Sequence, residues 1–171
     1  NYMDSKGQSA LLDANFFFIL MIISSSIVYL GVLNSMSYTY SYAQQYVIHG
    51  LNDILETNIT ACKITKGGME EEISSDRSVK WAIKKYLEKD YENQLNPGTP
   101  WDLSEVRNAI KHKFDIGIVG YEYALHAYQH QDNGGELFIS SQATDINNVP
   151  KGRYAHQLQV PGTPGYTITL Y

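Results

Sequence analysis

Residues 16–33 read FFFILMIISSSIVYLGVL, and this stretch decides how the chain is organised. It contains no Asp, Glu, Lys or Arg, and the charge-free gap around it extends from Asp13 to Asp53. Eighteen helical residues span about 27 Å, close to the hydrocarbon thickness of a bilayer. A buried helix of a soluble protein rarely stays apolar on every face for about five turns. The stretch therefore predicts a helix that crosses a membrane or forms a filament core, with residues 11–33 as its apolar part.

A cleaved secretory signal is the other interpretation of an N-terminal apolar run. The run is longer than a usual signal core, and no small-x-small cleavage site follows it, so we expect a retained anchor. Lys6 is the only Lys or Arg before the run, and Lys63 is the first after it. The positive-inside rule then favours a cytoplasmic N-terminus and a C-terminal domain outside the cell. The sequon Asn58-Ile59-Thr60 points the same way and makes Asn58 a candidate glycosylation site.

The helical pattern continues beyond the apolar run. Apolar residues recur at helical spacing as far as Leu55, so one long helix is predicted over residues 10–57, after a flank or leader-like segment at 1–9. Four tyrosines follow the run, and we expect them at the boundary between the apolar medium and water, where amphipathic rings gather. They are Tyr38, Tyr40, Tyr42 and Tyr46.

Residues 58–171 are predicted to form a soluble exterior head with two short helices. Asp76 is expected to cap the first helix, which carries an apolar stripe and ends near Tyr91. The sequence Asp-Leu-Ser-Glu at residues 102–105 has the spacing of a capping box and is expected to open the second helix. The apolar stripes are Val79, Ala82, Ile83, Tyr86 and Leu87 in the first helix, and Leu103, Val106, Ile110 and Phe114 in the second.

Beyond Gly120 the apolar period changes to two, which indicates strands. A first strand is expected from Tyr121, and three more over residues 136–144, 153–160 and 166–171. The predicted fold class is therefore α+β: a long apolar helix, then a head of two helices and an antiparallel sheet of about four strands.

Composition excludes some classes of function. The chain has 13 Lys and Arg against 18 Asp and Glu, a net charge of -5, so it offers no basic field for nucleic acid. Its one cysteine, Cys62, cannot build a disulfide framework or a cysteine-based metal site within one chain. We interpret Cys62 as a plain small residue, with pairing between chains as the alternative.

No catalytic, cofactor-binding or metal site is predicted, and we do not expect an enzyme. His126 and His130 have a spacing that suits a metal on a helix, but on the expected strand they would lie about 13 Å apart. Gly67-Gly68 lacks the spacing of a phosphate loop, and residues 70–72 (EEE) are interpreted as a solvated acidic run, a weak calcium candidate. The chain has no Gly-x-Ser-x-Gly motif.

Residues 6–13 (KGQSALLD), followed by the apolar helix, resemble the processing-site region of archaeal type IV pilin-like proteins. Those proteins have a positive leader, a Gly before the cut, a start with Gln or Ser, and an acidic residue near mature position five. Gln8 and Asp13 are five apart where the family has four, and a cut between Gln8 and Ser9 would place Asp13 at position five. The leader is either retained or processed upstream of Asn1. The tail, residues 153–155 (RYA) and 162–171 (GTPGYTITLY), also looks like the terminal strands of uncharacterised archaeal pilin-like surface proteins.

The resemblance implies a structural subunit of an archaeal extracellular filament or envelope assembly, in which Asp13 meets the N-terminal amine of a neighbouring chain. Its partners would be further copies of itself and membrane lipid. One alternative is a single-pass accessory subunit of a larger membrane complex, packed against other helices through Ser24, Ser25, Ser26 and Gly31. Another is a membrane-anchored exterior binding module. The residues expected to carry assembly are Asp13, Phe16, Phe17, Phe18, Leu20, Ile23, Ile27 and Leu30.

Overall fold

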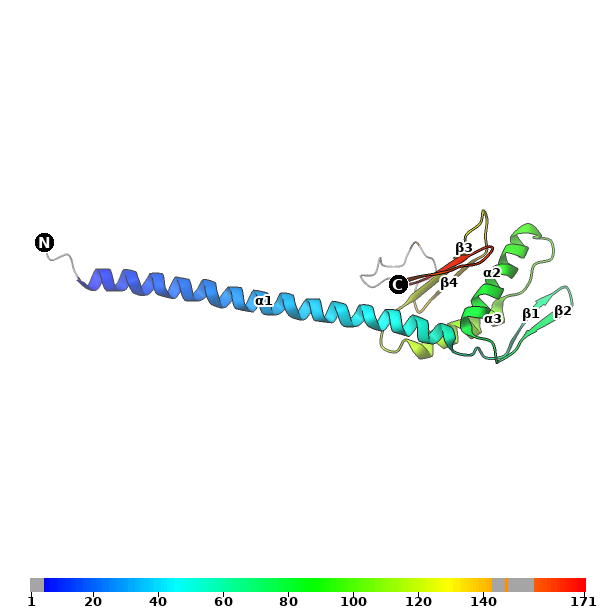
Figure 1. Cartoon of the computed structure of the whole chain (residues 1–171), viewed down its shortest axis with the longest axis horizontal. Helices are drawn as coiled ribbons and strands as arrows, with labels where there is room; N and C mark the ends of the chain where they lie inside the picture. Colours follow the sequence, from blue (N-terminus) through cyan, green and yellow to red (C-terminus); the bar gives the residue numbers. More distant parts are fainter. Residues whose placement is uncertain (1–4, 143–146, 148–155) are drawn as a thin grey trace. The chain divides into compact units, whose positions relative to one another are not determined.

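The computed structural model describes residues 5–142, 147 and 156–171, without the side chains of 5–11, 37–40 and 43. It has a long apolar N-terminal helix, further helices and antiparallel sheets, as the α+β prediction requires (Figure 1). The helices are α1 (Ser5–Glu56), α2 (Val79–Leu95) and α3 (Ser104–Gly117). The strands are β1 (Cys62–Lys66), β2 (Met69–Ile73), β3 (Ala124–Gln129), β4 (Glu136–Ser140), β5 (His156–Val160) and β6 (Tyr166–Leu170).

The chain divides into two compact units. The first ends at Tyr42, and the second, which we call the head, comprises Ala43–Tyr171. The last turns of α1 belong to the head because Leu51, Ile54 and Leu55 are buried in its core. Thr57 ends the helix, since its backbone N–H and its hydroxyl both donate to the Ile54 carbonyl, at 3.1 and 2.7 Å.

The head contains the predicted four-stranded antiparallel sheet, in the order β4-β3-β6-β5. One face carries Leu125, Ala127, Leu137, Ile139 and Ile168, all buried in the same core as the apolar stripes of α2 and α3. Alternation along β3 therefore matches the predicted period of two, although β3 begins at Ala124 and not at Tyr121. Two of the predicted strands, 136–144 and 153–160, are described only in part. Residues 143–144 of the first and 153–155 of the second lie outside the described residues.

Side chains from the helices close the outer edge of β4. The Asp90 carboxylate accepts the Glu136 backbone N–H at 3.0 Å, and the Arg107 guanidinium donates to the Phe138 carbonyl at 3.0 Å. Close packing accompanies these bonds, because a Cβ added to Gly135 would come within 1.9 Å of the Leu87 carbonyl oxygen. The chain just before β4 and helix α2 thus touch backbone to backbone at Gly135, where only glycine fits.

Of the two predicted helix caps, the one at α2 is wrong and the one at α3 is right in part. Ser78, and not Asp76, caps α2: its side chain accepts the Trp81 N–H at 3.2 Å, whereas Asp76 accepts from the Ser74 hydroxyl. At α3 the residue before the helix is Leu103, which forms no side-chain cap, but the carboxylate of the predicted Asp102 accepts the Ser104 backbone N–H at 2.9 Å. Glu105 does not complete a capping box because its carboxylate accepts the backbone N–H of Lys63 in β1, at 2.8 Å. A contact distant in sequence has replaced the local one.

A two-stranded hairpin precedes α2, and the sequence analysis missed it. Strands β1 and β2 pair antiparallel around Gly67 and Gly68, whose φ angles are +54° and +88°. Two consecutive positive φ angles define the turn that favours Gly-Gly in tight hairpins. Cys62, Ile64 and Ile73 are buried in the core, whereas Glu70 and Glu72 are exposed, so the acidic run is solvated as predicted but lies on strand β2.

Candidate membrane or assembly surface

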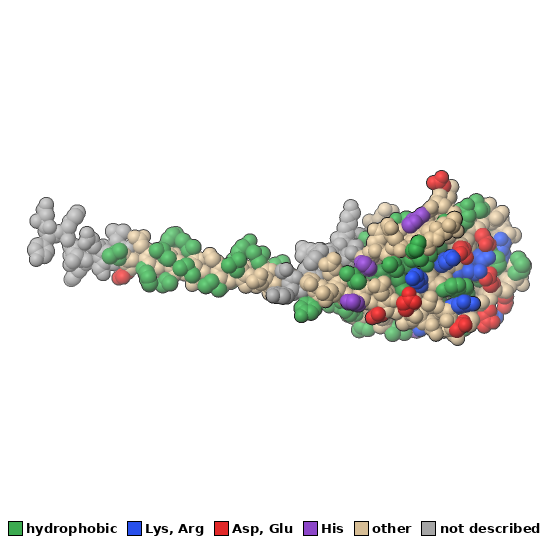
Figure 2. Space-filling view, viewed as in Figure 1, with side chains coloured by type: hydrophobic (Ala, Val, Ile, Leu, Met, Phe, Trp, Pro, Cys, Tyr) green, Lys and Arg blue, Asp and Glu red, His purple; other side chains and the backbone are tan. Residues whose placement is uncertain are grey.

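The first unit exposes a long apolar surface on α1. Residues Leu12–Met36 form a helix of 25 residues that is long and apolar enough to cross a membrane, and none of its apolar window is buried inside the chain (Figure 2). Soluble monomers rarely expose a contiguous apolar surface of this size. The seven apolar residues expected to carry assembly are 46–66% exposed. They are Phe16, Phe17, Phe18, Leu20, Ile23, Ile27 and Leu30.

Polar groups within this surface are partly satisfied by the helix itself. The Ser26 hydroxyl donates to the Ile22 carbonyl and the Ser35 hydroxyl to the Val32 carbonyl, each at 2.8 Å. Backbone N–H and C=O groups of a helix pair with one another, which an apolar medium requires. Such back-bonding lets serine hydroxyls enter that medium at reduced cost. The surface is therefore chemically suited to lipid or to an apolar helix bundle.

One carboxylate lies at the start of this surface. Asp13 is exposed and is the only Asp, Glu, Lys or Arg between Leu12 and Met36. Among the described side chains it forms no ion pair, so a cationic partner would come from outside them. A charge costs about 3 kcal/mol at the bilayer centre and less near the edge, where Asp13 would lie. Its position suits either a headgroup boundary or a neighbouring cation.

A shallow groove runs along one face of the same helix. It is lined by Ser24, Ser25, Val28, Tyr29 and Val32. Small side chains such as serine let a second helix approach closely. Of the four residues predicted to form a packing face, Ser24 and Ser25 thus line the groove, whereas Ser26 and Gly31 are not part of its lining.

Two histidines of the head, His126 and His130, are held by separate partners. The His126 ring lies 2.7 Å from a Glu136 carboxylate oxygen, and the His130 ring bonds to the Thr167 hydroxyl. Over residues 5–142, 147 and 156–171, no three His, Cys, Asp or Glu side chains come together as a metal cluster would require. These contacts are structural links between strands.

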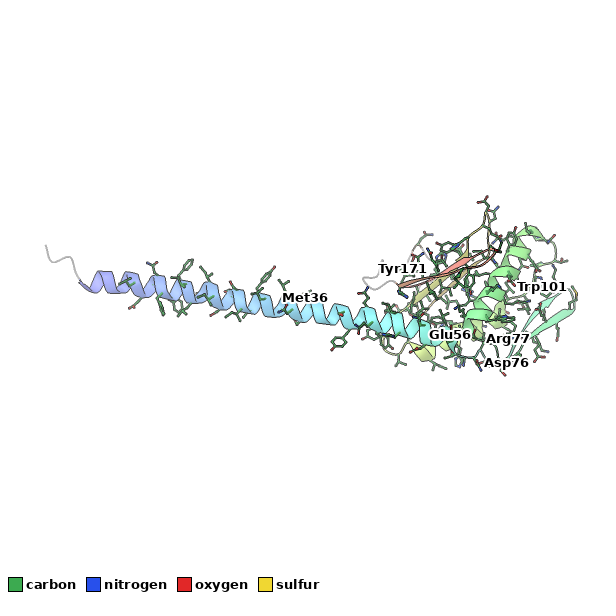
Figure 3. The ribbon with its side chains drawn as sticks, viewed as in Figure 1. Met36, Glu56, Asp76, Arg77, Trp101 and Tyr171 are labelled. Atoms are coloured by element: carbon green, nitrogen blue, oxygen red, sulfur yellow. The ribbon has the colours of Figure 1, made fainter. Side chains whose placement is uncertain are left out.

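The acidic strand β2 joins a cluster around Trp101 (Figure 3). Lys89 lies 4.2 Å from the centroid of the Trp101 ring and 3.0 Å from Glu92, whose carboxylate accepts the indole N–H at 2.6 Å. Lys89 also lies 3.7 Å from Glu71, and Lys85 pairs with the same carboxylate. Burial opposes ionisation of Glu92, but the bonds from Lys89 and Trp101 outweigh it and hold its pKa below the usual value. The cluster fastens the hairpin to α2.

Two further candidates lie close together after α1. Asn58 is exposed, in a β-bridge with Ser78, and Thr60 of the same sequon is exposed while Ile59 is buried. The acceptor amide is therefore open to solvent. Cys62 is buried in β1, and burial, together with the charge of Glu105, raises the pKa of its thiol. A protonated, covered thiol is a poor nucleophile, which disfavours pairing between chains.

The sequence analysis did not identify a second exposed apolar surface, which lies within the head. It consists of Tyr46 in α1, Ile116 in α3, and Val119 and Tyr121 in the segment between α3 and β3; we call it the loop surface. The signal was present as a charge-free run at residues 116–121, IGIVGY.

Comparison with known proteins adds no relative. No family model matches the chain, and neither a curated protein nor a solved structure matches it. Any function must therefore be argued from the chain's own surfaces.

Proposed function

We propose that this chain is a structural, pilin-like subunit that is held in a membrane and assembles through the exposed apolar face of α1. The observation that supports the proposal most is the exposure of Leu12–Met36, a 25-residue apolar helix with none of its window covered by the chain. At about 25 cal/mol per Å² of apolar area, leaving such a surface in water is strongly unfavourable. The surface must be covered, and lipid or copies of itself can both cover it.

Two features favour copies of the same chain, in preference to lipid, as what covers the apolar surface of α1 in the assembly. The groove at Ser24, Ser25 and Val28 offers close approach to a second helix. Asp13, at the start of the apolar surface, offers a negative charge that a cation on an adjacent copy would neutralise. In a bundle, that pairing would fix how far one helix is shifted along the next.

The test is imaging of the native material by electron cryo-microscopy together with mass spectrometry of the intact chain. We expect helical assemblies with Phe16–Leu33 at the centre. A single copy embedded in lipid beside unlike subunits would contradict the filament proposal and support the accessory-subunit alternative.

A matched pair of variants tests the role of Asp13. Asp13→Ala is expected to reduce the yield of assemblies at least tenfold, the equivalent of about 1.4 kcal/mol per contact. Asp53→Ala removes an exposed carboxylate from the same helix within the head and should leave the yield unchanged. Equal yields from both variants would overturn the registering role of Asp13 without bearing on the apolar contact.

A further inference from the structure

The four side chains of the loop surface are apolar and exposed. Val119 is 72% exposed, Tyr121 64%, Ile116 59% and Tyr46 42%. The rings of Tyr46 and Tyr121 contact each other, with their centroids 5.4 Å apart. A residue of α1 and a residue of the segment that follows α3 thus meet at these two rings.

The head holds this segment in a defined shape. Ile118 is buried, and its backbone N–H donates to the Phe114 carbonyl at 2.9 Å. Gly117 lies so close to α1 that an added Cβ would come within 2.5 Å of the Ile54 side chain. Gly120 has a φ of +82°, a conformation that residues with side chains rarely adopt. Val119 and Tyr121 are therefore exposed because the fold turns them outward.

A small apolar pocket adjoins the surface. Its volume is about 80 Å³, and Val47, Gly50, Ile118 and Leu170 are among the residues that line it. Glu122 is the only charged residue of its lining. Asp115, near the end of α3, is bonded to Lys111 at 2.7 Å and to the Tyr123 hydroxyl at 2.6 Å. The surface thus combines aliphatic side chains with two tyrosine rings and little charge.

We propose that the loop surface docks on the headgroup boundary of the membrane that holds Leu12–Met36. Tyrosine suits that boundary because its ring is apolar and its hydroxyl is polar. Tyr46 follows Met36 by ten residues, so the chain itself holds the loop surface within about 35 Å of the end of the apolar helix. A tether raises the effective concentration of lipid at this surface, whereas a second copy has no such tether. The inference rests on the proposed membrane location of the helix.

The test measures the surroundings of single spin labels on the full chain in phosphatidylcholine vesicles. Cys62→Ala removes the native thiol, and Val119→Cys provides the labelling site on the loop surface. Leu95→Cys is the matched control because Leu95 is an exposed apolar residue of the head, at the end of α2 (59%). Ile23→Cys reports on the apolar helix. Collision rates with oxygen, which concentrates in lipid, are compared with those of a water-soluble nickel chelate.

Docking predicts a several-fold higher oxygen-to-nickel ratio at Val119 than at Leu95, approaching the ratio at Ile23. A water-like ratio at Val119 beside a lipid-like ratio at Ile23 overturns the docking and leaves the membrane location intact. A water-like ratio at Ile23 overturns the membrane location itself. A Val119 label shielded from both reagents, with broadening from a neighbouring spin, assigns the loop surface to a second copy and overturns lipid docking.

The Val119→Cys, Tyr121→Ser double variant provides a second measurement. It removes an exposed ring and leaves the buried core untouched, so the head is expected to fold normally. If the loop surface docks on the membrane, the oxygen-to-nickel ratio of the label at position 119 is lower in the double variant than in the single variant, and approaches the ratio at position 95. An unchanged lipid-like ratio would show that Tyr121 takes no part, and the proposed surface would be wrong.

Discussion

Helix α1 carries leucines in both units of the chain, and these leucines differ in what covers them. Leu30, in the first unit, is 58% exposed, whereas Leu55, in the head, is 1% exposed. Both lie in one helix, and neither is unusual for helix propensity. The difference lies in what surrounds each side chain: Leu55 belongs to the buried core of the head, whereas within the described chain nothing covers Leu30. Apolar spacing thus predicts the helix, while the burial of each residue identifies which part needs an external partner.

The largest expected effect concerns the tightest contact in the head. Gly135→Ala places a methyl group where the Leu87 carbonyl lies, so β4 and α2 must separate. We expect a loss of about 3 kcal/mol or more in the free energy of unfolding. Urea unfolding followed by the fluorescence of Trp81 and Trp101, both in the head, measures it.

Gly50→Ala is the control for that variant, because no atom lies within 4 Å of the added methyl and the residue is helical. It should stabilise the head by up to about 1 kcal/mol. Similar losses from both variants would show that glycine flexibility, and not the close approach of β4 to α2, is what matters.

The second prediction applies one substitution to both halves of the helix. Leu55→Ala should cost about 2–5 kcal/mol of unfolding free energy because it opens a cavity in the core. Leu30→Ala should leave urea unfolding of the head within about 0.5 kcal/mol of the parent and instead weaken partitioning into vesicles. If Leu30→Ala destabilised the head as strongly as Leu55→Ala, the contrast between the halves would fail.

The third prediction concerns alkaline pH. Burial, followed by the charges of Glu88 and Glu56, raises the pKa of Tyr166 to about 12. Because the folded pKa is raised, the stabilisation is present below pH 10, where the unfolded tyrosine ionises, and is lost as pH rises from 10 to 12. Head stability should fall over that window by on the order of 2 kcal/mol.

Tyr166→Phe should make that decline shallower when stability is measured by urea unfolding at several pH values. It should not abolish the decline, because burial and the Asp115 carboxylate also raise the pKa of Tyr123. An unchanged decline would contradict the role assigned to Tyr166. Tyr42→Phe, outside the head, serves as the matched control.

The smallest effect is expected at the Trp101 cluster. Lys89→Met keeps an unbranched chain over the ring but removes the charge that lies between Glu71 and Glu92. We expect a loss of about 1 kcal/mol in unfolding free energy. Lys84→Met is the control, because Lys84 is 55% exposed and pairs only at long range with Glu88, at 3.8 Å. Raising the salt concentration should reduce the difference in unfolding free energy between the Lys89→Met and Lys84→Met variants.

Patterns that repeat along the chain were predictable, and single contacts between distant segments were not. The stripes of α2 and α3 are buried as predicted, with Tyr86 of α2 partly buried, because a helical period places all of them on one face. The capping box at α3 is incomplete because Glu105 has a partner 42 residues away in β1, which no local motif encodes. The hairpin was within reach of sequence reasoning, since Gly67-Gly68 between two short alternating segments is itself a hairpin signal.

Of the candidate surfaces, the apolar helix was predictable and the loop surface was not. The helix follows from a run of 18 residues without charge. The loop surface depends on which way the Ile118 side chain faces. Two glycines determine this direction: Gly117 through its close approach to Ile54, and Gly120 through its positive φ angle. Short charge-free runs are common in buried segments, so only coordinates separate the exposed Val119 from the buried Ile118.

The closed edge of β4 restricts how heads can associate. A free sheet edge is a template for strand addition and for amyloid-like aggregation. With the Glu136 N–H and the Phe138 carbonyl already bonded to Asp90 and Arg107, an incoming strand would have to displace a carboxylate and a guanidinium before it could pair. At high local density the head is thereby protected along β4 from cross-β growth, and contacts between copies there must be made by side chains instead of a shared sheet.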